Sequence, residues 1–155
     1  TNWSEVGGND EEIRAFQRPE NSGSQTGMLS LVMKDKELME PLKEDLIETM
    51  SAIINLVSDY DNGVNSIGYS YYYYATTMFE TIDSTVSDRI RLLAIDGVEP
   101  NNKTIKDEKY PLETAYYIVI RKDESKDSNT RKLVDAMLSD RGQAIAEEAG
   151  YVGVK

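Results

Sequence analysis

Hydrophobic and polar residues follow one another along this chain in blocks that predict strands and helices in turn. Residues 13–18, IRAFQR, predict a short strand that ends before Pro19, whose ring disfavours further pairing. Apolar residues at helical spacing after a serine-rich start predict a helix over 22–33. The same spacing predicts a second helix over 49–63, which an Asn-Gly pair ends.

The alternation continues to the C-terminus. Residues 65–79 predict a strand that turns helical at a run of tyrosines, and residues 88–97 predict another strand. Residues 114–121, TAYYIVIR, are largely β-branched and aromatic and predict the strongest strand of the chain. Residues 128–151 predict one or two helices, with Ser139 as a cap between them. Strands that alternate with helices favour an α/β fold, with a mixed or mostly parallel sheet flanked by helices.

Composition limits the chemistry open to this chain. Its 155 residues include no cysteine and no histidine, which excludes thiolate catalysis, a Ser-His-Asp triad and the commonest zinc ligands. The formal net charge of −11 argues against a nucleic-acid partner, because binding a phosphate backbone requires a basic face. No apolar run approaches the roughly 18 residues of a membrane span. We therefore expect a globular protein with no metal and no cofactor. Carboxylate-pair catalysis remains possible, but 28 acidic residues make carboxylate pairs inevitable by chance, so no residue is assigned as catalytic.

One loop combines an arginine with two hydroxyls around a glycine. Arg18, at the end of the first predicted strand, supplies a guanidinium fork matched to phosphate or carboxylate oxygens. Ser22 and Ser24 add hydroxyl donors, and Gly23 lets a ligand approach the backbone where a helix begins. The set predicts a site for a tetrahedral oxyanion. The alternative is an ordinary N-cap, with Arg18 paired to one of the 28 acidic residues.

This loop, RPENSGS, resembles the arginine and Ser-Gly-Thr phosphate loop of the substrate-binding proteins of phosphate ABC transporters. Ser24 stands where that family usually has threonine, which keeps the hydroxyl. Other blocks resemble segments of the same family in the same order: TNWSEVGG, SIGYSYYYYA, LLAIDGVEPNNKTI, YPLETAYYIVIRKD and LSDRGQAIAEEAGYVGV. Together they cover essentially all 155 residues.

The resemblance implies a lobe of the periplasmic-binding-protein type 2 fold. Residues 1–113 would form the second, central lobe with the anion-binding loop. Residues 114–155 would supply a return strand and C-terminal helices that complete the first lobe. The N-terminal part of that first lobe, with further hydroxyl donors and an aspartate, would precede Thr1. The residues of this chain that would bind phosphate are Arg18, Ser22, Gly23 and Ser24.

The resemblance also implies a function. The chain would bind inorganic phosphate as the solute-binding component of an ABC uptake system and deliver it to ABC permease subunits, with no chemistry performed on it. It would lie outside the cytoplasm, in the periplasm or as a lipoprotein at the cell surface. The alternative is an anion-sensing or scaffolding domain of the same fold without a transport role. An enzyme has little support without histidine or cysteine.

Two apolar features have several interpretations. The tyrosines of residues 69–74, YSYYYY, are expected in the core or at a lobe interface, with a ligand platform and a subunit contact as alternatives. An apolar stripe on the C-terminal helices is expected in the core and consists of Leu133, Val134, Met137 and Leu138. Without the first lobe to cover it, the region from residue 114 would fold back or pack against a second copy as a homo-oligomer.

Overall fold

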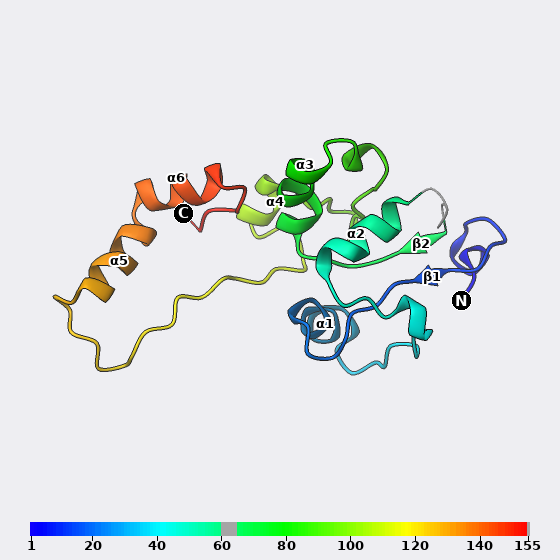
Figure 1. Ribbon diagram of the computed structural model, residues 1–155, viewed down its shortest axis with the longest axis horizontal. Coiled ribbons are helices and arrows are strands. Elements are labelled where there is room, and N and C mark those ends of the chain that lie inside the picture. The colour runs from blue at the N-terminus through cyan, green and yellow to red at the C-terminus, as the bar shows by residue number, and fades with distance from the viewer. Residues whose placement is uncertain (60–64, 155) are drawn as a thin grey trace. The chain divides into compact units, whose positions relative to one another are not determined.

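The computed structural model of the chain describes residues 1–59 and 65–154 (Figure 1). Its contacts divide the chain into two compact units, Thr1–Leu92 and Leu93–Lys155, each of which is described by itself. The division into lobes at residue 113, which the family resemblance implies, stays a prediction. In the part of the chain that the structure describes, no helix is long and apolar enough to cross a membrane.

Unit 1 is organised around two short parallel strands. Strand β1 (Arg14–Ala15) pairs with β2 (Ser66–Ile67), with Arg14 opposite Ser66 (Figure 1). The pairing continues past β1, because the Phe16 amide donates to the Ile67 carbonyl at 2.9 Å and Gln17 forms a parallel bridge with Leu46. The strands predicted over 13–18 and at the start of 65–79 are therefore confirmed at their centres.

The helices of unit 1 are short and several are not regular α-helices. Helical backbone covers residues 23–33, as predicted, but it changes from α to π geometry at Met28. The predicted second helix begins after its N-cap Thr49; its predicted end at Asn62 and Gly63 lies outside the described residues. The elements are η1 (Trp3–Val6), α1 (Gly23–Gly27), η2 (Met28–Met33), η3 (Lys43–Asp45), α2 (Met50–Ser58), η5 (Tyr74–Met78), α3 (Phe79–Ile82) and η6 (Val86–Asp88).

Helix α2 joins two small hydrophobic clusters in unit 1. Ile53 packs with Phe16 and Ile47, whereas its neighbour Ile54 packs with Phe79 and Val86. Full burial of each such side chain contributes roughly 1.5–3 kcal/mol. These clusters hold the strand end that precedes the candidate site against α2.

Gly68 and Trp3 hold the chain at the two ends of β2. A Cβ at Gly68 would lie 2.8 Å from Cγ2 of Ile53, so glycine permits this close approach to α2. Before β2, the indole Nε1 of Trp3 donates to the Asn65 carbonyl at 3.0 Å. The contact at Gly68 fixes the position at which the tyrosine segment begins.

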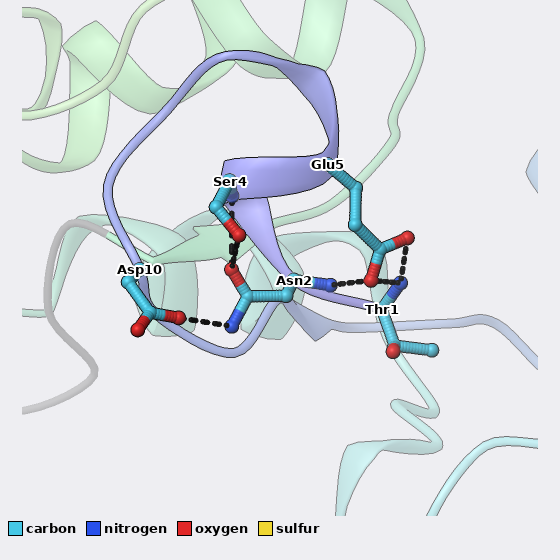
Figure 2. A network of polar contacts seen from close by, with 5 residues as sticks. All are labelled: Thr1, Asn2, Ser4, Glu5 and Asp10. Atoms are coloured by element: carbon cyan, nitrogen blue, oxygen red, sulfur yellow. Dashed lines mark hydrogen bonds and ion pairs between the residues drawn. The ribbon is translucent and has the colours of Figure 1, made fainter.

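Polar contacts organise the first residues of the chain (Figure 2). Asn2 caps η1 by accepting from the Ser4 amide at 2.9 Å, and the Glu5 carboxylate accepts from the Asn2 amide at 3.2 Å, which completes a capping box. The amine of Thr1 pairs with Glu5 at 3.2 Å, and Asn2 Nδ2 donates to Asp10 at 3.1 Å. These groups are exposed, so the network sets local geometry and contributes little stability.

Unit 2 consists of three helices and long connections. They are α4 (Asn102–Lys106), α5 (Asn129–Leu138) and α6 (Asp140–Glu148). Ser139 ends α5 and caps α6, accepting from the Gly142 amide at 3.2 Å, which confirms the predicted cap. Lys106 of α4 pairs with Glu147 of α6 at 2.6 Å.

Two predicted strands are wrong. Residues 88–97 form no strand, and Ile95 makes only an isolated bridge with Val98. Residues 114–121 run as an open trace between α4 and α5 (Figure 1). A β-branched, aromatic run becomes a strand only where a neighbouring strand offers its backbone groups. Among the described residues β1 and β2 are the only paired strands, so strand propensity alone did not suffice.

The apolar stripe of α5 was also misassigned to the core. Leu133, Met137 and Leu138 are 61%, 47% and 40% exposed, and Val134 is half-buried. The stripe follows helical spacing, as predicted, but the described residues supply no surface that covers it. An amphipathic pattern reports that a helix has an apolar side, not that the side is buried.

Candidate anion-binding site

The guanidinium of Arg18 is buried where β1 pairing ends. The side chain is 9% exposed. Its Nη1 donates to the Ile47 carbonyl at 2.6 Å, and its Nε donates to Ser24 Oγ at 3.4 Å. The strand end and the bridge between Gln17 and Leu46 bring these groups together. One nitrogen of the Arg18 guanidinium is therefore bound to a backbone carbonyl, and another is bound to a hydroxyl of the serine loop.

Arg14, four residues earlier, shows what an ordinary structural arginine looks like in this protein. Its Nε pairs with the buried Asp45 at 3.1 Å, and its guanidinium lies 5.0 Å from the centre of the Phe16 ring. Arg18 contacts only neutral oxygens, and no carboxylate within residues 1–59 and 65–154 forms an ion pair with it. A buried cation without a counter-charge is costly. The predicted alternative, in which Arg18 pairs with an acidic residue, does not occur among these residues.

The two serines lie on the same side of the loop. Ser22 Oγ is 3.0 Å from Ser24 Oγ, and both side chains are buried. Ser22 Oγ also accepts from the Gln25 amide at 3.2 Å, so Ser22 is the N-cap of α1. The cap that sequence offered as the alternative thus exists, and it coexists with the arginine–hydroxyl cluster.

Gly23 completes the predicted set. A Cβ at this position would lie 3.1 Å from the hydroxyl of Tyr71, which is tighter than most contacts in proteins. Gly23 therefore leaves the backbone at the start of α1 open to a close neighbour. All four predicted residues lie in one loop, and hydrogen bonds link Arg18, Ser24 and Ser22 in sequence.

Sequence reasoning missed two residues that contact this loop, Tyr69 and Gln25. The Tyr69 hydroxyl accepts from the Arg18 amide at 2.9 Å and donates to Oε1 of Gln25. Burial raises the pKa of Tyr69 above its ordinary value, and the nearby Arg18 opposes that rise. The tyrosine run was assigned to packing, and its spacing gives no signal that one hydroxyl reaches back to residue 18.

A hollow of about 700 Å³ is lined by Arg18 and Gln25 but not by the two serines. Its walls include Glu20 and Glu40 together with apolar side chains such as Met39. Two carboxylates disfavour an anion there, so the cluster of the Arg18 guanidinium with the two serine hydroxyls is the candidate site. No group of three or more acidic side chains in the described part of the chain could hold a metal ion.

Residues 1–141 match the family described as PBP superfamily domain. The chain belongs to this family. It is 24% identical over 159 residues to the phosphate-binding protein PstS of Borreliella burgdorferi and 29% identical over 154 residues to PstS of Bacillus subtilis. Each alignment covers 99% of this chain, but 53% and 45% of the relatives. The chain thus spans about half the length of these relatives.

Solved structures of the same kind have the same fold. The crystal structure of PstS from Borrelia burgdorferi matches 99% of this chain and 58% of its own, with a TM-score of 0.67 and 26% identity. A Clostridium perfringens structure with bound phosphate, assigned as a phosphate ABC transporter substrate-binding protein, matches all of this chain and 57% of its own, with a TM-score of 0.67 and 23% identity. The predicted α/β, periplasmic-binding-protein-like fold is therefore confirmed, and so is the resemblance to phosphate-binding proteins.

Proposed function

We propose that this chain binds inorganic phosphate as part of the solute-binding component of a phosphate ABC uptake system. The observation that carries the proposal is the buried guanidinium of Arg18, which lies beside two hydroxyls and has no carboxylate partner among the described residues. A bound oxyanion would supply the missing counter-charge. The relatives that are named phosphate-binding proteins support phosphate as that anion.

The hydroxyls are arranged to donate. Ser22 Oγ already accepts from the Gln25 amide, and Ser24 Oγ already accepts from Arg18. The two hydroxyls lie 3.0 Å apart, and either can donate to the other, so their protons can also be directed to a further acceptor. A tetrahedral oxyanion would accept both protons and the charge-assisted bonds of Arg18. Gly23 belongs to the proposed set because it places no side chain beside these hydroxyls, where the Tyr71 hydroxyl lies 3.1 Å from the position of a Cβ.

The wider role follows from the family. We infer a binding protein that performs no reaction on its ligand, works outside the cytoplasm and hands phosphate to ABC permease subunits. The names of the relatives support binding rather than catalysis. The chain also has no histidine or cysteine to act as base or nucleophile.

Phosphate titration of the 155-residue chain, followed by amide NMR shifts, tests the site. We expect a dissociation constant in the millimolar range or weaker, corresponding to about −4 kcal/mol, because the rest of the relatives' length has no counterpart here. Arg18→Ala should lose roughly 2–5 kcal/mol, so that no saturation is seen. Arg14→Ala is the matched control: it removes the ion pair with Asp45 and should leave phosphate affinity unchanged.

Equal phosphate affinity of Arg18→Ala and the unmodified chain would contradict the proposed site and make Arg18 a structural residue only. Micromolar binding by a monomer of this chain would contradict the expected weak affinity, because it would show that one lobe suffices and that no second set of donors is involved.

A further inference from the structure

Tyr69 is connected to both sides of the candidate loop but is not one of its predicted ligands. It follows β2 by two residues, and its hydroxyl lies between the Arg18 backbone and the Gln25 side chain. Arg18 belongs to the strand side of the loop, and Gln25 to the first turns of α1. One phenol group therefore joins the two elements that carry the guanidinium and the serine hydroxyls.

The hydrogen bond to Arg18 replaces a missing ladder contact. The amides of Phe16 and Gln17 donate to the carbonyls of Ile67 and Asp45, each at 2.9 Å. At Arg18 the amide instead donates to the Tyr69 hydroxyl. A buried amide without an acceptor is unfavourable. The Tyr69 hydroxyl thus extends the ordered backbone by one residue, to the residue whose side chain faces the serines.

The second hydrogen bond holds the helix side. Gln25 is 7% exposed, and its amide donates to Ser22 Oγ while its side chain accepts from Tyr69. Gln25 therefore contacts both the N-cap serine and the tyrosine. Through it, the position of Ser22 is coupled to the position of the Arg18 backbone.

We propose that Tyr69 is a positioning residue of the anion site, which fixes the spacing between the Arg18 guanidinium and the hydroxyls of Ser22 and Ser24 without touching the anion. This inference rests on the proposed phosphate binding. A site that binds a tetrahedral anion depends on donors held at a fixed spacing before the ligand arrives. Phenylalanine at position 69 would keep the ring but leave the Arg18 amide and the Gln25 carbonyl oxygen without their shared partner.

The test compares Tyr69→Phe with Tyr117→Phe. Tyr117 is 83% exposed and distant from the loop in sequence. Tyr117→Phe therefore controls for the loss of a phenol hydroxyl that is not buried. Phosphate titration by NMR should show about fivefold to tenfold weaker binding for Tyr69→Phe and no change for Tyr117→Phe. A urea unfolding curve for each variant establishes that the titrated protein is folded.

Hydrogen exchange gives a readout that a purely structural loss would not produce. In Tyr69→Phe the Arg18 amide proton should exchange faster, while the Phe16 amide, bonded to Ile67, keeps its protection. Uniform loss of protection at both amides would mean general destabilisation and would overturn the inference. The same holds if Tyr69→Phe binds phosphate as well as the unmodified chain does.

The two proposals fail differently. If the unmodified chain binds phosphate, Arg18→Ala does not and Tyr69→Phe does, the proposed function stands and the role of Tyr69 is refuted. If the unmodified chain shows no phosphate-dependent shift, the proposed function fails, and the positioning role falls with it whatever the exchange rates show.

Discussion

The two units of this protein differ most in what they bury. In unit 1, Phe16, Ile53, Phe79 and Val86 are each 1–2% exposed. Among the described residues of unit 2, only Gly153 is buried. The helices of unit 2 nevertheless have proper N-caps and apolar sides. Unit 2 thus has regular helices without the buried hydrophobic residues that pack against the helices of unit 1.

This difference indicates where each unit gets its stability. Isolated helices of nine or ten residues, the lengths of α6 and α5, are marginal in water. Caps contribute to them, but an amphipathic helix gains most of its stability by burying its apolar side. Unit 1 carries its own hydrophobic clusters, whereas unit 2 requires a covering surface. The exposed Leu133, Met137 and Ile145 mark where that surface would lie.

The largest expected contrast lies between two core-type substitutions. Phe16→Ala should destabilise the chain by about 3–5 kcal/mol, because Phe16 is 1% exposed and packs against Ile53. Leu133→Ala, at a side chain 61% exposed, should change the stability of the monomer by no more than about 0.5 kcal/mol. Urea unfolding of both variants, at a protein concentration low enough to keep the chain monomeric, measures this. Similar losses would show that the Leu133 stripe is covered within one copy of the chain and that the comparison is mistaken.

The next contrast concerns association. We expect the exposed side of α5 and α6 to be covered by a second copy of the chain, since each apolar side chain buried there contributes roughly 1.5–3 kcal/mol. Sedimentation velocity should show a dimer. Met137→Glu should convert this dimer to monomer, whereas Ile82→Glu, at an exposed residue of unit 1, should leave the dimer intact. A monomer at high micromolar concentration would contradict this expectation, and the stripe would then be exposed as the structure has it.

The smallest contrast uses two helix caps. Thr49→Ala removes the cap of α2, and Ser139→Ala removes the cap of α6; each should cost about 1 kcal/mol of helix stability. In unit 1 the loss should appear as a lower urea midpoint, because α2 unfolds with the clusters it joins. In unit 2 it should appear as lower helicity before any denaturant is added, measured by circular dichroism. Equal midpoint shifts in both variants would indicate one cooperative core.

Local signals predicted the helices and the first strands well. Ser22 and Ser139 were recognisable as caps because a cap depends on residues close in sequence. The strands predicted at 88–97 and 114–121 are wrong because a strand depends on a partner distant in sequence. Nothing within TAYYIVIR reveals whether such a partner is at hand. The same limit explains why the α5 stripe was expected in the core.

The residues proposed to bind the anion could be predicted from the sequence, but the contacts that position them could not. Arg18, Ser22, Gly23 and Ser24 stood out because charge, hydroxyls and glycine occur together at a strand-to-helix turn. That Arg18 forms no ion pair with a carboxylate in residues 1–59 and 65–154 could not be predicted from a chain with 28 acidic residues. The connection through Tyr69 spans 51 residues of sequence and depends on the parallel pairing of β1 with β2.

The indole of Trp3 allows the unfolding of unit 1 to be followed separately, by fluorescence. It is the single tryptophan of the chain, and its hydrogen bond to the Asn65 carbonyl ties it to the chain beside β2. Its fluorescence therefore reports on unit 1, whereas far-ultraviolet ellipticity sums the helices of both units. The two signals superimpose during unfolding only if the units unfold in one transition. Ellipticity lost while the emission stays constant would assign the early event to residues 93–155.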